Sequence, residues 1–343
     1  MSLQVRRADA PPAGWQELAR ELGSFYHEPA WCALLAREFG FAIEYLTSHD
    51  ADRLTGLLPL ARVRGLSRTR LVSLPFSYAV GPVARDVDSL LALMAHAGDT
   101  AKDGKLSLEI KSLAHEVPLA PGFSRREDYS TFIVDLAGGE AATFERLHSS
   151  TRRGIRKAEK GNLAVTADNG AESWLAFARL QEGTSHGHGL PAPPRRFFVE
   201  GCRALGDQGL ASLRLARVGG VPVAGIVLWQ GARNWIYAFG ASRADALEAR
   251  PNHLLIWRAI GDAIGAGKGF DLGRASPQQP GLVEFKRRWG AQPVPLAYDY
   301  WPEPRGLNTL SRDSGALALL GKVWSHLPAP LARAGSVLYR YMA

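Results

Sequence analysis

The sequence predicts an α/β (α+β) fold with two tandem domains of the same kind and a helical C-terminal tail. Short runs of β-branched and aliphatic residues alternate with amphipathic helical stretches. The same order of elements, an antiparallel meander followed by a helix and a further strand, occurs twice along the chain. After Trp301 this pattern stops at Pro302, Pro304 and Gly306. The chain therefore divides into domains at residues 1–138 and 139–305 and a tail at residues 306–343.

The first copy of this order begins with a meander. Strands are expected at residues 41–47, 54–63 and 70–74, because each run is rich in strand-forming residues and bounded by Gly, Asp or Ser. A helix is expected at residues 86–96, with Asp86 or Asp88 as its N-cap, and a strand at residues 105–110.

The second copy shows the order more clearly. A helix is expected to begin near Glu140, and Gly219 and Gly220 form a tight hairpin turn. The helix after Pro251 ends at Gly267, which is a typical helix stop. The expected strands are 211–218, 221–230, 234–239, 270–272 and 293–300, and the later helices are 252–266 and 283–289.

The tail at residues 306–343 contains two short amphipathic stretches. One face can lie on a membrane surface, with basic residues at its rim. The modest charge density favours packing of the tail on the body of the protein or on a second copy. The residues concerned are Trp324, Leu327, Leu331, Val337 and Leu338, with Lys322, Arg333 and Arg340 at the rim.

Composition and charge limit the class of protein. Of 343 residues, 46% are hydrophobic and 22% charged, which is typical of a globular chain. No apolar stretch follows the N-terminal arginines, and the longest uncharged run, residues 218–232, is too short to span a bilayer. We therefore expect a cytoplasmic protein, with peripheral contact at the inner face of the cytoplasmic membrane as an alternative for the tail. Cys32 and Cys202 lack metal-ligand spacing and are expected to be buried thiols.

Basic charge is concentrated in one expected helix. The net charge of +8 favours acidic partners, and Arg152, Arg153, Arg156 and Lys157 occupy about one helical turn. Arginine binds phosphate through two parallel hydrogen bonds, so this cluster predicts a phosphate-bearing ligand. The alternative, a solvated helix face, is equally compatible with the pattern.

Four segments carry a resemblance to a known family. The run RRGIRKAEKG at residues 152–161 is similar to an RRxIRKAxKxG pattern, and FKRRWG at residues 285–290 is similar to FKxxFG, with Trp289 where Phe is usual. NHLL at residues 252–255 and DLGR at residues 271–274 also fit. Together they resemble FemAB-like proteins of the GNAT acyltransferase superfamily, in particular the branch associated with exopolysaccharide and exosortase systems. The match covers residues 140–301 well and the N-terminal half more loosely.

This resemblance implies an N-acyltransferase built from two GNAT-like domains, with donor and acceptor in clefts at their junction. It would form an amide by transferring an acyl or aminoacyl group to an amine on a cell-envelope glycan or peptide precursor, such as a peptidoglycan precursor. The donor would be aminoacyl-tRNA or an acyl thioester such as acyl-CoA. The partners implied are a phosphate-bearing precursor and tRNA, and the oligomeric state is left open.

The same resemblance implies roles for individual residues. Lys286, expected to be an exposed side chain in a cleft, would bind the developing oxyanion or a donor phosphate, and Phe285 would form a wall of the donor site. Asp271 would orient the amine or accept its proton; a cap or an ion pair with Arg274 is the alternative. These three residues are the expected catalytic set.

Further residues are expected to bind substrate. Tyr237 can donate to the leaving group or simply pack in its strand, and Asn252 and Arg274 lie in the matching segments. His186 or His188 would face the acceptor, in a stretch that otherwise predicts a flexible loop. The full set is Arg152, Arg153, Arg156, Lys157, His188, Tyr237, Asn252 and Arg274.

Two absences shape the expected chemistry. Residues 240–250 lack the clustered glycines with which backbone amides approach the pyrophosphate of acyl-CoA, which counts against acetyl-CoA as donor. The His-Gly-His step at residues 186–188 lacks a third ligand at metal-binding spacing. We therefore expect neither a permanently bound cofactor nor a metal.

Three alternatives stay open at this point. One is an N-acyltransferase in exopolysaccharide biosynthesis that depends on acyl-CoA or acyl carrier protein. Another is a non-catalytic accessory protein of a polysaccharide machine, in which the fold serves only for binding. The third, nucleic-acid binding alone, fits the positive charge but lacks aromatic residues interleaved with the basic run.

Overall fold

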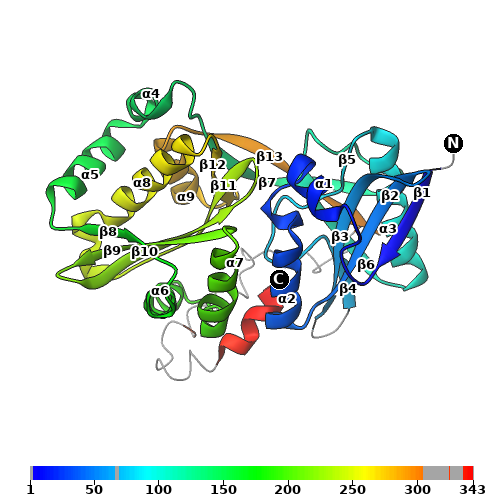
Figure 1. Ribbon diagram of the computed structural model, residues 1–343, viewed down its shortest axis with the longest axis horizontal. Coiled ribbons are helices and arrows are strands. Elements are labelled where there is room, and N and C mark those ends of the chain that lie inside the picture. Colours follow the sequence, from blue (N-terminus) through cyan, green and yellow to red (C-terminus); the bar gives the residue numbers. More distant parts are fainter. Residues whose placement is uncertain (1–2, 66–68, 304–323, 325–334, 343) are drawn as a thin grey trace. The chain divides into compact units, whose positions relative to one another are not determined.

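The computed structural model describes residues 3–65, 69–303, 324 and 335–342. Its contacts divide the described chain into two compact units (Figure 1). The first unit contains residues 3–131 and 294–303, and the second contains residues 132–293, 324 and 335–342. The chain therefore leaves the first unit after Thr131 and returns to it at Val294.

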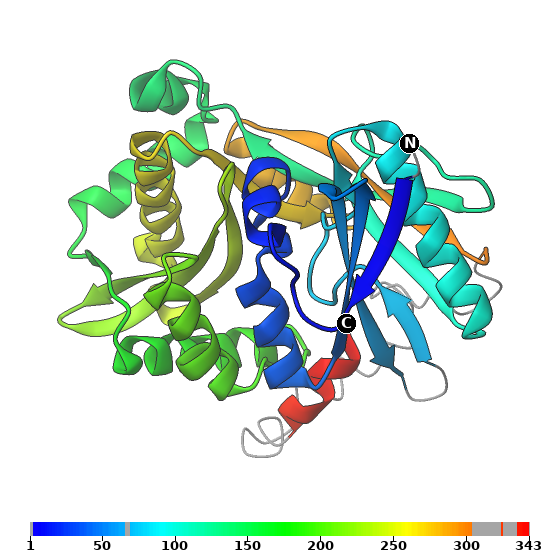
Figure 2. The ribbon, with the colours of Figure 1, turned by 45° about the vertical axis from the view of Figure 1, so that its right-hand side comes forward.

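The first unit is a mixed sheet with helices on both faces (Figure 2). Its strands follow the order β1-β2-β3-β4-β6-β13, with β5 beside β3. Neighbours are antiparallel except β4 and β6, which are parallel. The strands are β1 (Leu3–Ala8), β2 (Ala42–Asp50), β3 (Arg53–Arg64), β4 (Thr69–Val72), β5 (Val83–Ala84), β6 (Ser107–Leu113) and β13 (Ala291–Trp301); the helices are α1 (Trp15–Leu22), η1 (Phe25–His27), α2 (Pro29–Phe39) and α3 (Val87–Asp103).

Helix α3 supplies much of the core of the first unit. Asp86 caps this helix by accepting from the backbone N–H of Ser89 at 2.7 Å, as its sequence predicts. Leu93 and Met94 of the helix are fully buried against Leu58 and Leu60 of β3. Burial of these side chains fixes which face of the helix meets the sheet.

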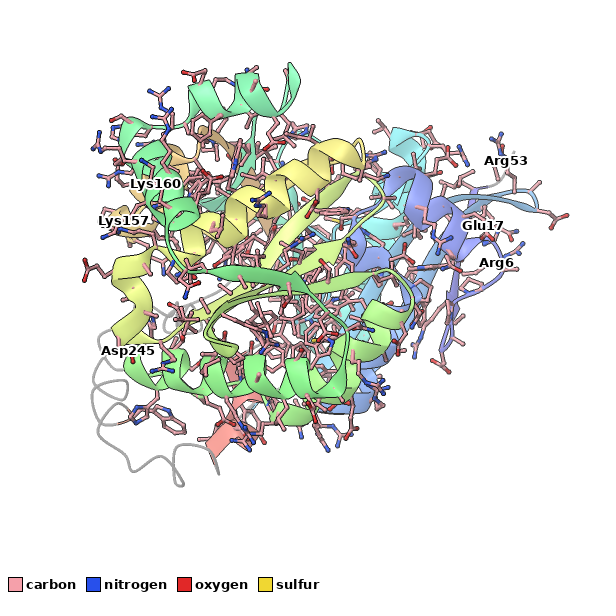
Figure 3. The ribbon with its side chains drawn as sticks, turned by 60° about the vertical axis from the view of Figure 1, so that its left-hand side comes forward. Arg6, Glu17, Arg53, Lys157, Lys160 and Asp245 are labelled. Carbon is pink, nitrogen blue, oxygen red and sulfur yellow. The ribbon has the colours of Figure 1, made fainter. Side chains whose placement is uncertain are left out.

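The second unit repeats the order of the first. Its sheet runs β12-β11-β10-β9-β8, and Figures 1 and 3 show α8 on one face and α6 on the other. Its strands are β8 (Ala164–Ala167), β9 (Ala211–Val218), β10 (Val221–Gln230), β11 (Asn234–Ser242) and β12 (Gly269–Ala275). Its helices are α4 (Gly139–Arg146), α5 (Ser149–Lys160), α6 (Ala171–Gly187), the π-helix η2 (Phe197–Cys202), α7 (Arg203–Asp207), η3 (Ala244–Ala249), α8 (Pro251–Gly265), α9 (Pro280–Arg288) and η5 (Gly335–Met342).

Both faces of the second sheet are buried. Leu255 and Ala259 of α8 pack on Ile226 and Leu228 of β10, in one continuous core. The opposite face carries an aromatic cluster in which the Phe198 ring lies 5.2 Å from Phe177 and 5.3 Å from Phe239. Because both faces are covered, the functional groups of this unit lie at strand ends and on helix surfaces.

Most predicted elements of both copies are confirmed within one to a few residues at their ends, although α3 continues to Asp103, seven residues beyond its expected end. The alternative of a flexible loop at residues 184–191 is wrong for residues 184–187, which are the last turn of α6. Ser185 is buried there, and Thr184 Oγ1 accepts from the backbone N–H of Ser242 at 3.3 Å. These tertiary contacts outweigh the helix-breaking composition of the segment.

Part of the expected tail lies outside the described residues, including Lys322, Leu327, Leu331 and Arg333. Trp324 is helical and half-buried, and Leu338 of η5 is exposed. Among the described residues, no helix is long and apolar enough to cross a membrane.

Candidate active site

The parallel strands β11 and β12 separate at the point where the expected catalytic residues lie. Their pairing joins Asn234–Ile236 to Gly269–Asp271, although β11 continues to Ser242 and β12 to Ala275. A bulge between Val227 and Leu228 in the register of β10 with β11 turns β11 at the same level. Tyr237 is therefore the first residue of β11 beyond the last pair, and Gly273 is the second residue of β12 beyond it.

Asp271 ends the paired part of β12. Its side chain is buried, and Oδ1 accepts a hydrogen bond from the backbone N–H of Gly273 at 2.7 Å. Gly273 has φ +80°, in the left-handed region that favours glycine. The carboxylate is thus held by a local turn of its own strand.

Lys286 approaches the same turn from α9. Its Nζ donates to the backbone oxygens of Gly273 at 2.5 Å and Arg274 at 2.9 Å, and lies 5.3 Å from the centre of the Phe132 ring. Only 3% of the residue is exposed. Burial lowers the pKa of Lys286 to about 8; the Asp271 carboxylate opposes this shift, and Arg274 adds to it.

The burial of Lys286 corrects the expectation of an exposed side chain in a cleft. Within the basic sequence of α9, Lys286 and Trp289 are buried and face the interior of the second unit, while Arg287 and Arg288 are exposed. The aliphatic part of a lysine can pass through apolar surroundings when its amine finds acceptors, as it does here.

Of the two phenylalanines discussed with Lys286, Phe285 was expected from the sequence motif and Phe132 was not. Phe285 packs on the core of the second unit, with its ring 6.4 Å from that of Trp289. Phe132 was not anticipated, because it comes from β7 (Ser124–Val134), far from Lys286 in the sequence. Its role appears only when strand and helix are brought together.

Tyr237 lies beside the same turn. Its carbonyl oxygen is 3.5 Å from the position that a Cβ on Gly273 would take. Burial raises the pKa of its hydroxyl to about 12, so the phenol keeps its proton at neutral pH. A Cβ on Gly240 would collide with that hydroxyl, which shows that the Tyr237 side chain folds over Gly240. The structure thus brings Asp271, Arg274 and Lys286 together, with the backbone carbonyl of Tyr237 beside their turn.

The basic cluster on α5 occupies a separate surface. Arg152 pairs with Glu145 at 2.5 Å and Lys157 with Glu248 at 3.3 Å, while the Arg156 guanidinium lies 5.3 Å from the centre of the Phe144 ring. Arg153 is exposed. Figure 3 shows Lys157 and Lys160 projecting outward from the helix. These residues do not join Lys286, which faces inward from α9.

Helices α5 and α9 nevertheless touch at their ends. The backbone N–H of His148 and the hydroxyl of Thr151 both donate to the carbonyl oxygen of Arg288, at 2.9 Å and 3.0 Å. The start of α5 is therefore anchored to the end of the helix that carries Lys286.

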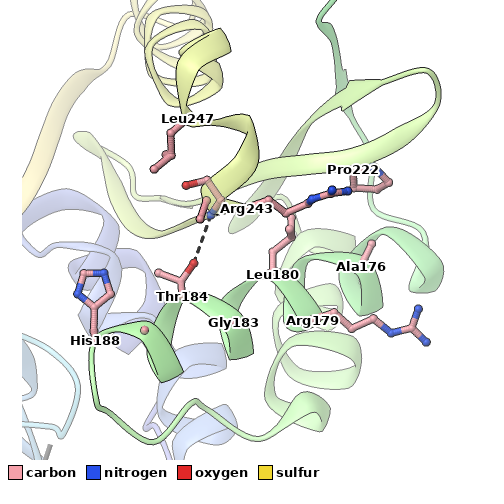
Figure 4. Close-up of a pocket in the computed structure, with 12 residues that line it drawn as sticks. Ala176, Arg179, Leu180, Gly183, Thr184, His188, Pro222, Arg243 and Leu247 are labelled. Carbon is pink, nitrogen blue, oxygen red and sulfur yellow. Dashed lines mark hydrogen bonds between the residues drawn. The ribbon is translucent and has the colours of Figure 1, made fainter. Parts of the chain in front are cut away.

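A pocket of about 670 Å³ opens elsewhere on the second unit, between α6 and the end of β11 (Figure 4). Its wall is mostly apolar, with the basic side chains of Arg179, His188 and Arg243 added. The complete lining is Ala176, Arg179, Leu180, Gly183, Thr184, Gly187, His188, Pro222, Ser242, Arg243, Ala244 and Leu247. Such a pocket suits an anionic ligand with an apolar portion.

Asn252 supports the wall of this pocket. Its Nδ2 donates to Ser242 Oγ at 3.3 Å, and its Oδ1 is buried with no hydrogen-bond partner among the described residues. Ser242 is five residues beyond Tyr237 on β11, which corresponds to about 16 Å along a strand. Asn252 and His188 therefore belong to the pocket and not to the turn around Lys286.

In the part of the chain that the structure describes, no group of three or more His, Cys, Asp or Glu side chains is arranged so that it could hold a metal ion. The side chains of Cys32 and Cys202 are both buried.

Comparison with known protein families gives a match that lies within the second unit. Residues 145–287 match a family model described as an acetyltransferase (GNAT) domain. This segment includes α5, Tyr237, Asp271 and Lys286. Among curated protein sequences, none matches the chain.

Solved structures extend the likeness to both units. The crystal structure of FemX aligns with a TM-score of 0.69 at 15% identity, over 86% of this chain and 96% of that chain. L-PGS from Bacillus licheniformis gives 0.59 at 14% identity, over 93% and 99%. A tandem GNAT protein from the clavulanic acid biosynthesis pathway gives 0.51 at 13% identity, over 89% and 100%. At these identities the likeness concerns the fold, and it confirms the expected tandem GNAT architecture.

Proposed function

We propose that this chain transfers an acyl or aminoacyl group to an amine and forms an amide, since residues 145–287 match the model of an acetyltransferase (GNAT) domain. The acceptor amine belongs to a glycan or peptide precursor of the cell envelope, and the donor is an activated ester or thioester. The observation that carries the proposal is the ammonium group of Lys286, held at the turn where β11 and β12 separate.

The reaction requires charge stabilisation at one oxygen. The acceptor nitrogen attacks the donor carbonyl carbon, and the carbonyl oxygen becomes an oxyanion before the bond to the leaving oxygen or sulfur breaks. Lys286 has three N–H donors, of which two are used by the carbonyls of Gly273 and Arg274. The third can bind the oxyanion, and burial strengthens that interaction.

Proton transfer can use the neighbours of Lys286. The attacking amine must lose a proton, and Asp271, an acidic group at the strand end, orients that amine or accepts its proton. The leaving group must gain a proton or a hydrogen bond, and the protonated hydroxyl of Tyr237 can donate one. Phe285 and Phe132 limit access of water near Lys286.

Phosphate on donor or acceptor has two candidate sites in the second unit. The exposed face of α5 presents Arg153, and the pocket presents His188 together with Arg179 and Arg243. We assign the pocket to the acceptor and the α5 surface to the longer polyanion. Binding at both sites would be weakened by salt.

The donor that we favour is aminoacyl-tRNA, with acyl-CoA as the alternative. Residues 244–249 form the 3₁₀ helix η3, in which the N–H of Ala246 donates to Arg243 and that of Arg250 to Leu247. These amides are therefore engaged within the turn and cannot cradle a pyrophosphate without rearrangement. GNAT domains as a class use acyl-CoA, so the experiment that tests the donor includes thioesters as well as aminoacyl-tRNA.

The test is a transfer assay with defined donors. The purified chain is incubated with an amine acceptor and with radiolabelled aminoacyl-tRNA, acetyl-CoA or a long-chain acyl-CoA, beside a Lys286→Met control. We expect amide product from aminoacyl-tRNA that falls at least 100-fold in the control. If only acyl-CoA gives product, the donor is acyl-CoA and not aminoacyl-tRNA. Absence of product with every donor, together with saturable binding of the acceptor, would favour the accessory role.

A further inference from the structure

Gly273 links the two charged groups of the candidate active site through its own backbone. Its N–H donates to Asp271 Oδ1 at 2.7 Å, and its carbonyl oxygen accepts from Lys286 Nζ at 2.5 Å. One residue thus binds the carboxylate on one side and the ammonium on the other.

The left-handed conformation of Gly273 makes this double contact possible. Its φ is +80°, whereas a residue in a parallel strand has φ near −120°. A change to the strand value would rotate the N–H by about 160° around the N–Cα bond relative to the carbonyl. The two hydrogen bonds could then not form together.

Space around Gly273 is limited but not closed. A Cβ there would lie 3.5 Å from the carbonyl oxygen of Tyr237 and 3.9 Å from Lys286 Nζ, both ordinary van der Waals distances. A side chain is therefore disfavoured by backbone conformation more than by collision. This separates the conformational effect from simple crowding.

We propose that Gly273 is a positioning residue, whose left-handed backbone sets the distance and orientation between the Asp271 carboxylate and the Lys286 ammonium. The proposal rests on the amide-forming function given above. The charged groups that act on Lys286 are Asp271 and Arg274 of β12, and the ring of Phe132 of β7 lies 5.3 Å from its Nζ. The carbonyl oxygen of Tyr237 of β11 lies on the Gly273 side of the turn.

The test compares two glycines with the same backbone conformation. Gly273→Ala places a side chain at φ +80°, and Gly267→Ala does so at φ +65°, after α8, where no described atom lies within 4 Å of the new Cβ. Both variants suffer similar backbone strain, so their melting temperatures are expected to fall by similar amounts. Only Gly273→Ala should reduce kcat, by at least tenfold, with a smaller change in KM.

A second measurement follows Lys286 itself and does not depend on activity. Trace labelling with acetic anhydride at a series of pH values, followed by peptide mass spectrometry, gives the apparent pKa of the Lys286 amine. We expect about 8 in the wild type and in Gly267→Ala, and a displacement of at least half a unit in Gly273→Ala. If transfer is absent from the wild type but this displacement occurs, the function proposed above fails and the positioning role stands.

Asparagine provides the conservative variant, since it adopts left-handed φ more readily than alanine. Gly273→Asn should keep the Lys286 pKa within half a unit of the wild type and the rate within about threefold. If Gly273→Ala does not fold, the Lys286 pKa and the rate of Gly273→Asn still test the positioning role of Gly273. A Gly273→Ala protein that matches the wild type in rate and labelling would overturn the proposal. A folded Gly273→Asn protein whose Lys286 pKa differs from that of the wild type by more than half a unit would also overturn the proposal.

Discussion

At the scale of single residues, Lys286 is the most consequential departure from what its sequence context suggests. A lysine that is followed by two arginines would be expected on the solvent-facing side of a helix. Lys286 is instead buried, and its Nζ donates to two backbone carbonyl oxygens. The sequence motif identified the residue, whereas its burial depends on Phe132 and Gly273, which come from other strands. Local pattern can therefore select a functional residue without predicting its electrostatic environment.

Burial of Lys286 predicts a pH-dependent stability. Its pKa falls from 10.5 when unfolded to about 8 when folded, so the unfolded chain binds more protons between these values. Stability should rise as pH increases from 8 to 10.5, by up to about 3 kcal/mol from this group, and this gain is absent below pH 8. Urea unfolding at pH 7.5 and pH 9.5 measures the gain.

Lys286→Met is the control for that measurement, because methionine keeps the length of the side chain without a charge. The variant should be at least as stable as the wild type at pH 7.5 and should lack the increment attributed to Lys286. An equal increment in the variant and the wild type would show that another group titrates.

At the scale of elements, the meanders, α3 and α8 were predictable because periodicity, caps and turns agree along each segment. Strand β8 was not, because it is a short and mostly exposed edge strand without an alternating pattern. The end of α6 was misread as a loop, since only its contact with β11 shows why it stays helical. Elements that depend on distant partners are the ones that sequence pattern misses.

The packing of α5 on α8 yields a prediction about stability. Gly154 faces His253, where a Cβ would lie 2.5 Å from the imidazole Cδ2. Gly154→Ala should therefore destabilise the protein by about 1–3 kcal/mol despite the better helix propensity of alanine. Urea or thermal unfolding provides the measurement.

Gly183→Ala in α6 is its matched control, because no described atom lies within 4 Å of the new Cβ. This substitution should stabilise the protein by about 0.5–1 kcal/mol, as alanine replaces glycine in a helix. If Gly154→Ala also proves stabilising, α5 does not pack on α8 as described.

At the scale of the whole molecule, the duplicated order of elements was visible in the sequence, but the return of the chain to the first unit was not. Residues Leu296–Trp301 of β13 pair with Leu108–Leu113 of β6, a separation that local pattern cannot reveal. Asp299 in this strand is fully buried, and Arg125 of β7 binds it through two hydrogen bonds of 2.8 Å. From sequence alone, a charged residue in a strand is expected to face solvent, and its burial can be explained only when its partner is known.

The pair of Arg125 and Asp299 should anchor the returning strand. Asp299→Ala leaves a partly buried arginine without this partner and should cost about 3–5 kcal/mol. Asp128→Ala, at an exposed position of β7, should change stability by less than about 0.5 kcal/mol. Equal unfolding midpoints for the two variants would show that the ion pair does not hold β13 in place.

The central claim is that protonated Lys286 stabilises the oxyanion of amide formation, and the pH dependence of transfer tests it most directly. With acceptor and donor saturating, the rate should be level near neutrality and fall as pH rises through about 8, where the ammonium loses its proton. A rate that instead rises through pH 8 to a plateau would contradict the claim, because Lys286 would then act as a base or take no part in catalysis.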